Sequence, residues 1–163
     1  MATTSKPPHR YALTLVWEGN RGTGTSDYAS YGRQYRVSMA GKPDLLGSAD
    51  PLFRGDSALH NPEELLLTAL SSCHMLSYLA LCARSRITVL RYSDETEGTL
   101  ELRPDGGGSF REAILRPRVT VAAGADLGRA TALHEKAGEQ CFIASSCNFP
   151  VRHLPVVEIE AAP

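Results

Sequence analysis

The stretch NPEELLLTALSSCHMLSYLALCAR, residues 61–84, decides the fold of this chain. Asn61 is a good N-cap, Pro62 suits the first helical position, and Glu63 and Glu64 complement the positive end of the helix dipole. The residues that follow are mostly apolar or small, and no face carries a regular stripe of charge. The pattern therefore predicts a helix of about two dozen residues, roughly 35 Å long, that is buried on all sides.

Length and charge restrict the class of protein. The chain has 163 residues and a formal net charge of -1. It is long enough for one domain with a real core, and it lacks the charge excess that nucleic acid or an anionic membrane would attract. We expect a flexible leader over residues 1–9 and a single domain over residues 10–163, with no nucleic-acid or membrane partner.

The N-terminus and the long helix both argue against a membrane location. The opening residues, MATTSKPPHR, lack the apolar core of a signal peptide. Ser71, Ser72, His74 and Ser77 interrupt the apolar run of the helix, which is unfavourable in a bilayer span. We therefore expect a cytoplasmic protein, in which the cysteines are reduced.

Extended segments precede the helix. Residues 10–18 alternate in polarity as a strand does, residues 19–26 are a glycine-rich turn that contains Arg21, and residues 31–39 form a second strand. A long connection, residues 41–60, contains Arg54. Because a compact domain rarely holds an idle loop of that length, this connection is a candidate for function.

The pattern after the helix completes an α+β fold. Glycines and prolines punctuate it: Gly98 is a bulge candidate, and Pro117 favours an edge or bulged strand. Asp126 can cap a second helix that ends near Cys141. Extended segments are predicted at 87–92, 99–102, 112–122 and 151–160, with a turn at 105–109. Strands in groups without βαβ alternation indicate an α+β fold around an antiparallel sheet.

Four cysteines, at positions 73, 82, 141 and 147, are the main candidates for chemistry. Cys73 and Cys141 could form a nucleophile and resolving pair, although free cysteines are commonly small buried hydrophobes. Cys82 lies nine residues after Cys73, half a turn away from it, and is expected in the core. Cys147 could replace Cys141 as the resolving thiol or be structural.

Other site types have weaker support. The cysteines and His74 are metal-ligand types, but no CxxC or HxxxH spacing is present, so we expect neither a metal nor another cofactor. No GxSxG motif marks a serine nucleophile. The histidines at 60, 74, 134 and 153 are interpreted as packing or surface residues, while His74 remains an alternative for tuning Cys73.

The run NPEELLLTALSSCHM, followed by a second helix that ends at Cys141, closely resembles the OsmC/Ohr superfamily of osmotically inducible and organic hydroperoxide resistance proteins. The resemblance covers nearly the whole chain. It implies an OsmC-like fold in which the sheet wraps around the long helix of an intertwined homodimer. Phe142 and His74 depart from the usual proline and aromatic residues at these positions.

The resemblance also implies an activity and a set of site residues. Cys73 would be the peroxidatic cysteine and Cys141 the resolving one, with Glu63 holding an arginine beside the first thiol. That arginine would be Arg54, with Arg21 as the alternative. The implied reaction reduces organic hydroperoxides, and also hydrogen peroxide, through a Cys73 sulfenic acid and a Cys73–Cys141 disulfide. An external dithiol, such as a lipoylated protein, would be the reductant.

The spacing of Glu63 and Cys73 independently predicts a dimer. Ten residues of helix separate them by about 15 Å, so they cannot share a site within one straight helix. Two such helices that pack antiparallel across a twofold axis would bring the Glu63 end of one copy near Cys73 of the other. We therefore expect an obligate homodimer. The alternative function is a non-catalytic protein that binds a small apolar ligand or senses oxidants at the dimer cleft.

Overall fold

The structure is a computed structural model that describes residues 7–161. It divides into two compact units, one up to Glu64 and one from Leu65 onward. The predicted leader lies partly outside the described residues, and residues 7–9 are exposed and without secondary structure.

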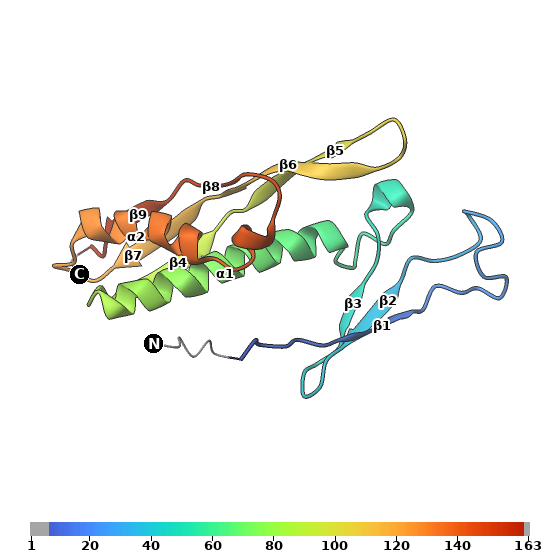
Figure 1. The fold of residues 1–163 in the computed structure, drawn as a ribbon, viewed down its shortest axis with the longest axis horizontal. Coiled ribbons are helices and arrows are strands. Elements are labelled where there is room, and N and C mark those ends of the chain that lie inside the picture. The colour runs from blue at the N-terminus through green and yellow to red at the C-terminus, as the bar shows by residue number, and fades with distance from the viewer. Residues whose placement is uncertain (1–6, 162–163) are drawn as a thin grey trace, which may run out of the picture. The chain divides into compact units, whose positions relative to one another are not determined.

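The first unit is a three-stranded antiparallel sheet in the order β1-β2-β3 (Figure 1). Its strands are β1 (Thr14–Trp17), β2 (Tyr35–Ser38) and β3 (Leu45–Gly47), followed by the 3-10 turn η1 (Pro51–Phe53). The two predicted strands are present but shorter than predicted. The long connection predicted over 41–60 contains the third strand, since Leu45–Gly47 pairs with β2.

The long helix α1 (Pro62–Arg84) confirms the predicted helix and its cap. The Asn61 side chain accepts a hydrogen bond from the Glu64 amide at 2.8 Å, and Glu64 accepts one from the Asn61 amide at 3.3 Å. This reciprocal pair is a capping box.

The prediction that the helix is buried on all sides is wrong for the single chain. Only Leu70, His74, Tyr78 and Cys82 are buried along α1, at a spacing of four residues. One stripe therefore faces the core, and the apolar residues on the other faces are covered less completely. Composition alone could not distinguish these faces because small and apolar residues occur on all of them.

The second unit contains two three-stranded sheets, ordered β4-β7-β9 and β5-β6-β8. The β4-β7 and β5-β6 pairs are antiparallel, and the last two strands each add to a sheet in parallel, as the β6-β8 and β7-β9 pairs. The α+β prediction is therefore confirmed, with mixed rather than purely antiparallel sheets. The strands are β4 (Val89–Asp94), β5 (Glu97–Leu102), β6 (Gly108–Leu115), β7 (Pro117–Val121), β8 (Val151–His153) and β9 (Val156–Ile159).

Two predicted strands are divided in the structure. The segment 112–122 breaks between β6 and β7, and Pro117 opens β7, the central strand of its sheet, so the edge prediction is wrong. A proline is tolerated at the first residue of a strand because its missing amide hydrogen is not needed there. The segment 151–160 breaks into β8 and β9. The irregularity in β5 lies between Thr99 and Leu100 rather than at Gly98.

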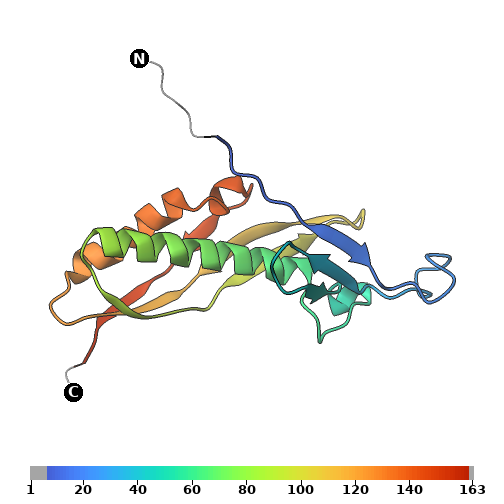
Figure 2. The ribbon, with the colours of Figure 1, turned by 90° about the horizontal axis from the view of Figure 1, so that it is seen from below.

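The second helix, α2 (Leu127–Gln140), begins at the predicted cap, where Asp126 accepts from the Arg129 amide at 2.9 Å. In the second unit α1 and α2 lie beside the strands, as Figures 1 and 2 show from two directions. A shared core joins both helices to the β4-β7-β9 sheet. It consists of Tyr78, Cys82, Ile87, Val119, Val121, Ala130 and Ala137.

Candidate functional site

The structure brings Cys73 and Cys141 together. Cys73 is partly exposed near the middle of α1, and Cys141 is the C-cap of α2 with 1% of its surface exposed. The Cys73 side chain is close enough to Cys141 to help raise the pKa of the Cys141 thiol, and both residues are free thiols. The predicted pair is therefore a pair in space, and its catalytic roles stay a prediction.

The surroundings of Cys141 keep it protonated. Burial raises the pKa of its thiol to about 11, and the neighbouring Cys73 acts in the same direction. The Ala144 amide donates a hydrogen bond to the Cys141 sulfur at 3.4 Å and opposes the shift only in part. At neutral pH Cys141 is thus a buried neutral thiol beside a more accessible one.

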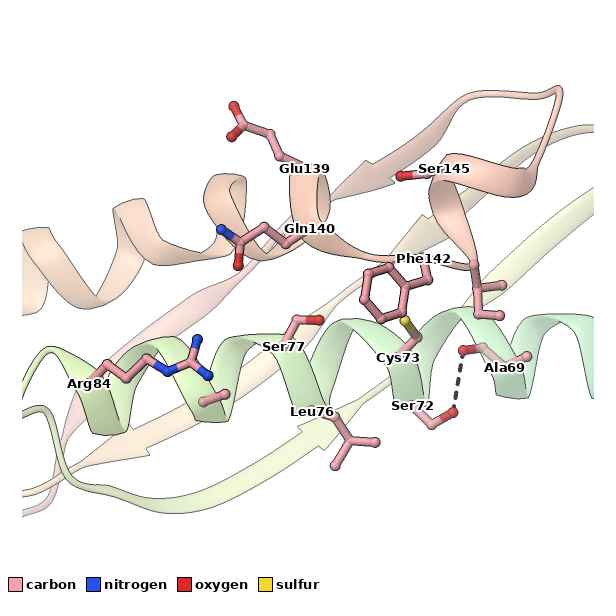
Figure 3. A pocket seen from close by; sticks show the side chains of 12 residues that line it. Ala69, Ser72, Cys73, Leu76, Ser77, Arg84, Glu139, Gln140, Phe142 and Ser145 are labelled. Atoms are coloured by element: carbon pink, nitrogen blue, oxygen red, sulfur yellow. Dashed lines mark hydrogen bonds between the residues drawn. The ribbon is translucent and has the colours of Figure 1, made fainter. Parts of the chain in front are cut away.

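A cavity of about 730 Å³ opens over Cys73. In Figure 3 the Cys73 thiol points from α1 toward the segment after α2 that carries Phe142. Small and apolar side chains dominate the lining near the thiol, and Arg84, Glu139 and Gln140 lie toward the other end. The full lining is Ala69, Ser72, Cys73, Leu76, Ser77, Ala80, Arg84, Glu139, Gln140, Phe142, Ile143 and Ser145.

Sequence reasoning missed Leu76, Phe142 and Arg84 as lining residues. The signal for Leu76 and Arg84 is helical periodicity, since residues three, seven and eleven positions after Cys73 return close to its face of α1. Phe142 was noted only as a departure from the family pattern. Leu76 is 63% exposed and Phe142 is 82% exposed, so two large apolar side chains border the thiol without cover in the single chain.

Glu63 and the two candidate arginines belong to the first unit. One carboxylate oxygen of Glu63 is buried and has no hydrogen-bond partner, and the Glu63 charge contributes, after burial, to raising the pKa of Tyr35. Within residues 7–161 no ion pair joins Glu63 to Arg54 or Arg21. The Glu63–arginine pairing therefore stays a prediction, with an unsatisfied acceptor in its favour.

The candidate arginines differ in how they are held. Arg54 has a left-handed backbone with φ 65° at the end of η1, and its guanidinium lies 5.7 Å from the centre of the Tyr28 ring. Arg33, which sequence reasoning did not consider, packs more closely against Tyr28, at 4.4 Å. Arg21 is exposed in the glycine-rich turn.

The remaining cysteines and histidines fall outside the cavity. Cys82 is 1% exposed and belongs to the core, as predicted. His74 points into the core rather than toward the cavity, because adjacent side chains on a helix diverge by about 100°. Cys147 is partly exposed after the 3-10 turn η2 (Ala144–Ser146), and burial raises the pKa of its thiol. Across the described part of the chain, no cluster of three or more metal-ligating side chains is present.

Comparisons with known proteins identify the family. A family model described as OsmC-like protein matches residues 55–153. No curated protein matches the chain. An OsmC-like protein of unknown function from Vibrio cholerae has a similar structure, with a TM-score of 0.82 and 29% identity, over 91% of this chain and 100% of that one.

Two more distant structures have the same fold. An organic hydroperoxide resistance protein OsmC from Legionella pneumophila matches with a TM-score of 0.65 and 17% identity, over 96% of this chain and 100% of that one. The organic hydroperoxide resistance protein OhrB of Bacillus subtilis matches with a TM-score of 0.59 and 18% identity, over 92% and 98%. The family match covers more than half of the sequence and includes both thiols, and the chain therefore belongs to the OsmC-like protein family.

Proposed function

We propose that this protein is a thiol peroxidase that reduces organic hydroperoxides in the cytoplasm. The observation that carries the proposal is that a partly exposed Cys73, which lines a largely apolar cavity, lies beside the buried thiol of Cys141. Such a pair suits a reversible thiol peroxidase, because the second thiol intercepts the sulfenic acid before it is oxidised further.

The reaction has three steps. The Cys73 thiolate attacks the outer oxygen of the hydroperoxide, the O–O bond breaks, and alcohol leaves while Cys73 becomes a sulfenic acid. Cys141 displaces water from that sulfenic acid and forms the Cys73–Cys141 disulfide. An external dithiol, for which a dihydrolipoyl group on a partner protein is our candidate, then reduces the disulfide by exchange.

The apolar rim supports an organic substrate. Leu76, Phe142 and Ile143 border Cys73 and favour an alkyl or aryl group over bulk water. Glu63, with Arg54 or alternatively Arg21, would stabilise the Cys73 thiolate and orient the peroxide. Because Glu63 lies ten residues from Cys73 on α1, we assign these charged groups to the second copy of a homodimer.

Uncovered apolar surface supports that dimer. All four residues of β1 are exposed, Leu15 and Trp17 among them, and α1 is buried along only one stripe. By length and composition alone α1 could also cross a bilayer, but its buried stripe packs into the core of a folded unit through Tyr78 and Cys82. A second copy is therefore the occupant we propose, and a stable, active monomer in sedimentation would exclude it.

The decisive experiment measures consumption of cumene hydroperoxide with a dithiol reductant. Cys73→Ser should abolish turnover, and Cys141→Ser, oxidised in the absence of the dithiol, should consume one equivalent of hydroperoxide and accumulate a sulfenic acid that dimedone traps. Cys147→Ser is the matched control, because it removes another partly exposed thiol and should retain turnover. Undiminished turnover by Cys73→Ser would refute the proposal.

The alternative is a non-catalytic member of the family that binds a small apolar ligand in the cavity over Cys73. The size and apolar rim of that cavity favour this candidate as well. Mass spectrometry after a stoichiometric dose of cumene hydroperoxide separates the two. A peroxidase should give the Cys73–Cys141 disulfide, whereas a binding protein should remain reduced or oxidise without preference among its cysteines.

A further inference from the structure

Three histidines form a buried stack with a tyrosine in the core of the second unit. The His74 ring lies between those of His153, at a centroid distance of 4.2 Å, and His134, at 5.3 Å, and His134 stacks on Tyr78 at 3.7 Å. His74 and His134 have 0% and 1% of their surface exposed. The proposed peroxide chemistry uses none of these rings.

A hydrogen bond within this imidazole stack joins the two helices. His74 Nε2 on α1 lies 3.0 Å from His134 Nδ1 on α2. Burial is the main cause that lowers the pKa of His74 to about 4 and that of His134 to about 3, so both rings are neutral at neutral pH. A neutral imidazole carries one N–H, so one ring donates and the other accepts.

The stack is expensive in free energy, which argues against simple space filling. His74 Nδ1, His134 Nε2 and His153 Nε2 are buried without hydrogen-bond partners. Each unsatisfied buried polar atom lowers the stability of the fold relative to an apolar group of the same shape. Leucine or phenylalanine would fill the same volume without that cost, but neither could form a directional bond between α1 and α2.

The location of this bond connects it to the thiols. His74 directly follows Cys73 on α1, and His134 precedes Cys141 by seven residues, which is about two turns of α2. His134 and Cys141 therefore lie on the same side of α2, the side that faces α1. A disulfide forms only when the two Cβ atoms approach to about 3.5–4.5 Å, so a small displacement of α2 would prevent it.

We propose that the His74–His134 hydrogen bond is a positioning contact that holds α2 in the register at which Cys141 attacks oxidised Cys73. His74 and His134 are thus positioning residues for the resolving step, not for the attack on peroxide. The role of this contact in peroxide reduction rests on the proposed function. Its effect on disulfide formation between Cys73 and Cys141 does not require peroxide.

Dithiodipyridine tests the contact without any peroxide, in a Cys147→Ser background that removes the other partly exposed thiol. The Cys73 thiolate attacks the reagent, forms a mixed disulfide and releases one thiopyridone. Cys141 then loses its proton, attacks the Cys73 sulfur and expels a second thiopyridone as the Cys73–Cys141 disulfide forms. The two releases are resolved by absorbance and the product by mass spectrometry.

The variants keep or remove the polar atom that forms the His74–His134 hydrogen bond. His134→Leu should slow the second release by about tenfold or more while the first is unchanged, since misplacement affects only the intramolecular attack. His134→Asn, whose amide occupies the place of Nδ1, should restore the second release to within about threefold of the parent. His153→Phe keeps a ring stacked on His74 and should leave both releases unchanged.

A second release in His134→Leu as fast as in the parent, or no rescue in His134→Asn, overturns the proposal. If His134→Leu does not fold, as judged by circular dichroism, His74→Leu and His74→Gln make the same comparison from α1, because glutamine can place its amide near the Nε2 position. Because no peroxide is involved, absence of peroxidase activity would refute the proposed function and leave this test intact.

Discussion

Acid should destabilise this protein through its buried histidines. Burial lowers the pKa of His74 to about 4 and of His134 to about 3, below the ordinary value of 6.5. Below pH 6.5 the unfolded chain takes up protons at these positions and the folded chain does not. The free energy of unfolding therefore falls as the pH drops from 6.5, and this loss levels off only near the folded-state pKa values.

The magnitude follows from the two shifts. Between pH 7.5 and pH 5.5 each histidine should remove about 1.4 kcal/mol from the free energy of unfolding, so the pair removes about 2.7 kcal/mol. That is a large fraction of the roughly 5–15 kcal/mol that stabilises an ordinary domain.

Urea unfolding at fixed protein concentration measures the loss. Far-UV circular dichroism is the suitable signal, because α1 and α2 carry the two histidines and dominate the helical spectrum. The double variant His74→Gln/His134→Asn should lose about 2.7 kcal/mol less than the parent over the same pH range. His9→Asn removes an exposed histidine instead and serves as the control.

Comparison with the double variant isolates the histidines, because carboxylates elsewhere in the chain contribute equally to both proteins. An equal loss of stability in parent and double variant would refute the reasoning and show that the imidazoles are protonated in the folded state. A difference in stability between the two proteins that first arises below pH 4 would contradict the reasoning as well. Folded-state pKa values lowered below 6.5 require the parent to lose stability already as the pH drops through 6.5.

Three further predictions concern single positions. Gly138→Ala should lower the free energy of unfolding by about 1–3 kcal/mol, because the added Cβ would lie 2.7 Å from the His153 ring. Gly128→Ala, at an exposed site of the same helix, should instead raise the free energy of unfolding by about 0.5–1 kcal/mol. The same urea assay measures both. Asn61→Ala should cost about 1 kcal/mol through loss of the 2.8 Å cap, measured by thermal unfolding, and an unchanged melting temperature would contradict the capping role. In the reduced protein, Cys141 should resist iodoacetamide below pH 9 because its pKa is raised to about 11 by burial, and rapid alkylation there, mapped by mass spectrometry, would disprove its burial.

Local signals in the sequence identify the helices well and the strands less well. Asn61 and Asp126 cap α1 and α2 where their side-chain chemistry predicts, because a cap depends on residues three positions apart. The divided strands were not predictable in the same way. Pro117 has a local signature that suits an edge, a bulge or the start of a strand, and only the neighbours of β7 decide among these.

The site shows the same division. Cys73 stands out in the sequence because a thiol occurs amid small and polar residues in an apolar helix, and the family resemblance pairs it with Cys141. Helical spacing from Cys73 points to Leu76, but Phe142 lines the cavity because two segments about 65 positions apart pack together, which neither residue type nor spacing reveals.

The sequence by itself determined the helix at 61–84, its cap, the α+β class, the family and the cysteines worth testing, because capping, periodicity and motif spacing are local properties. Only the tertiary structure decided which face of α1 is buried and that Cys73 meets Cys141. It alone brought His74, His134 and His153 into one stack. The physical reason is that burial and side-chain contact depend on elements distant in the chain. When apolar residues occur on every face of a helix, its local sequence does not indicate which face packs against those elements.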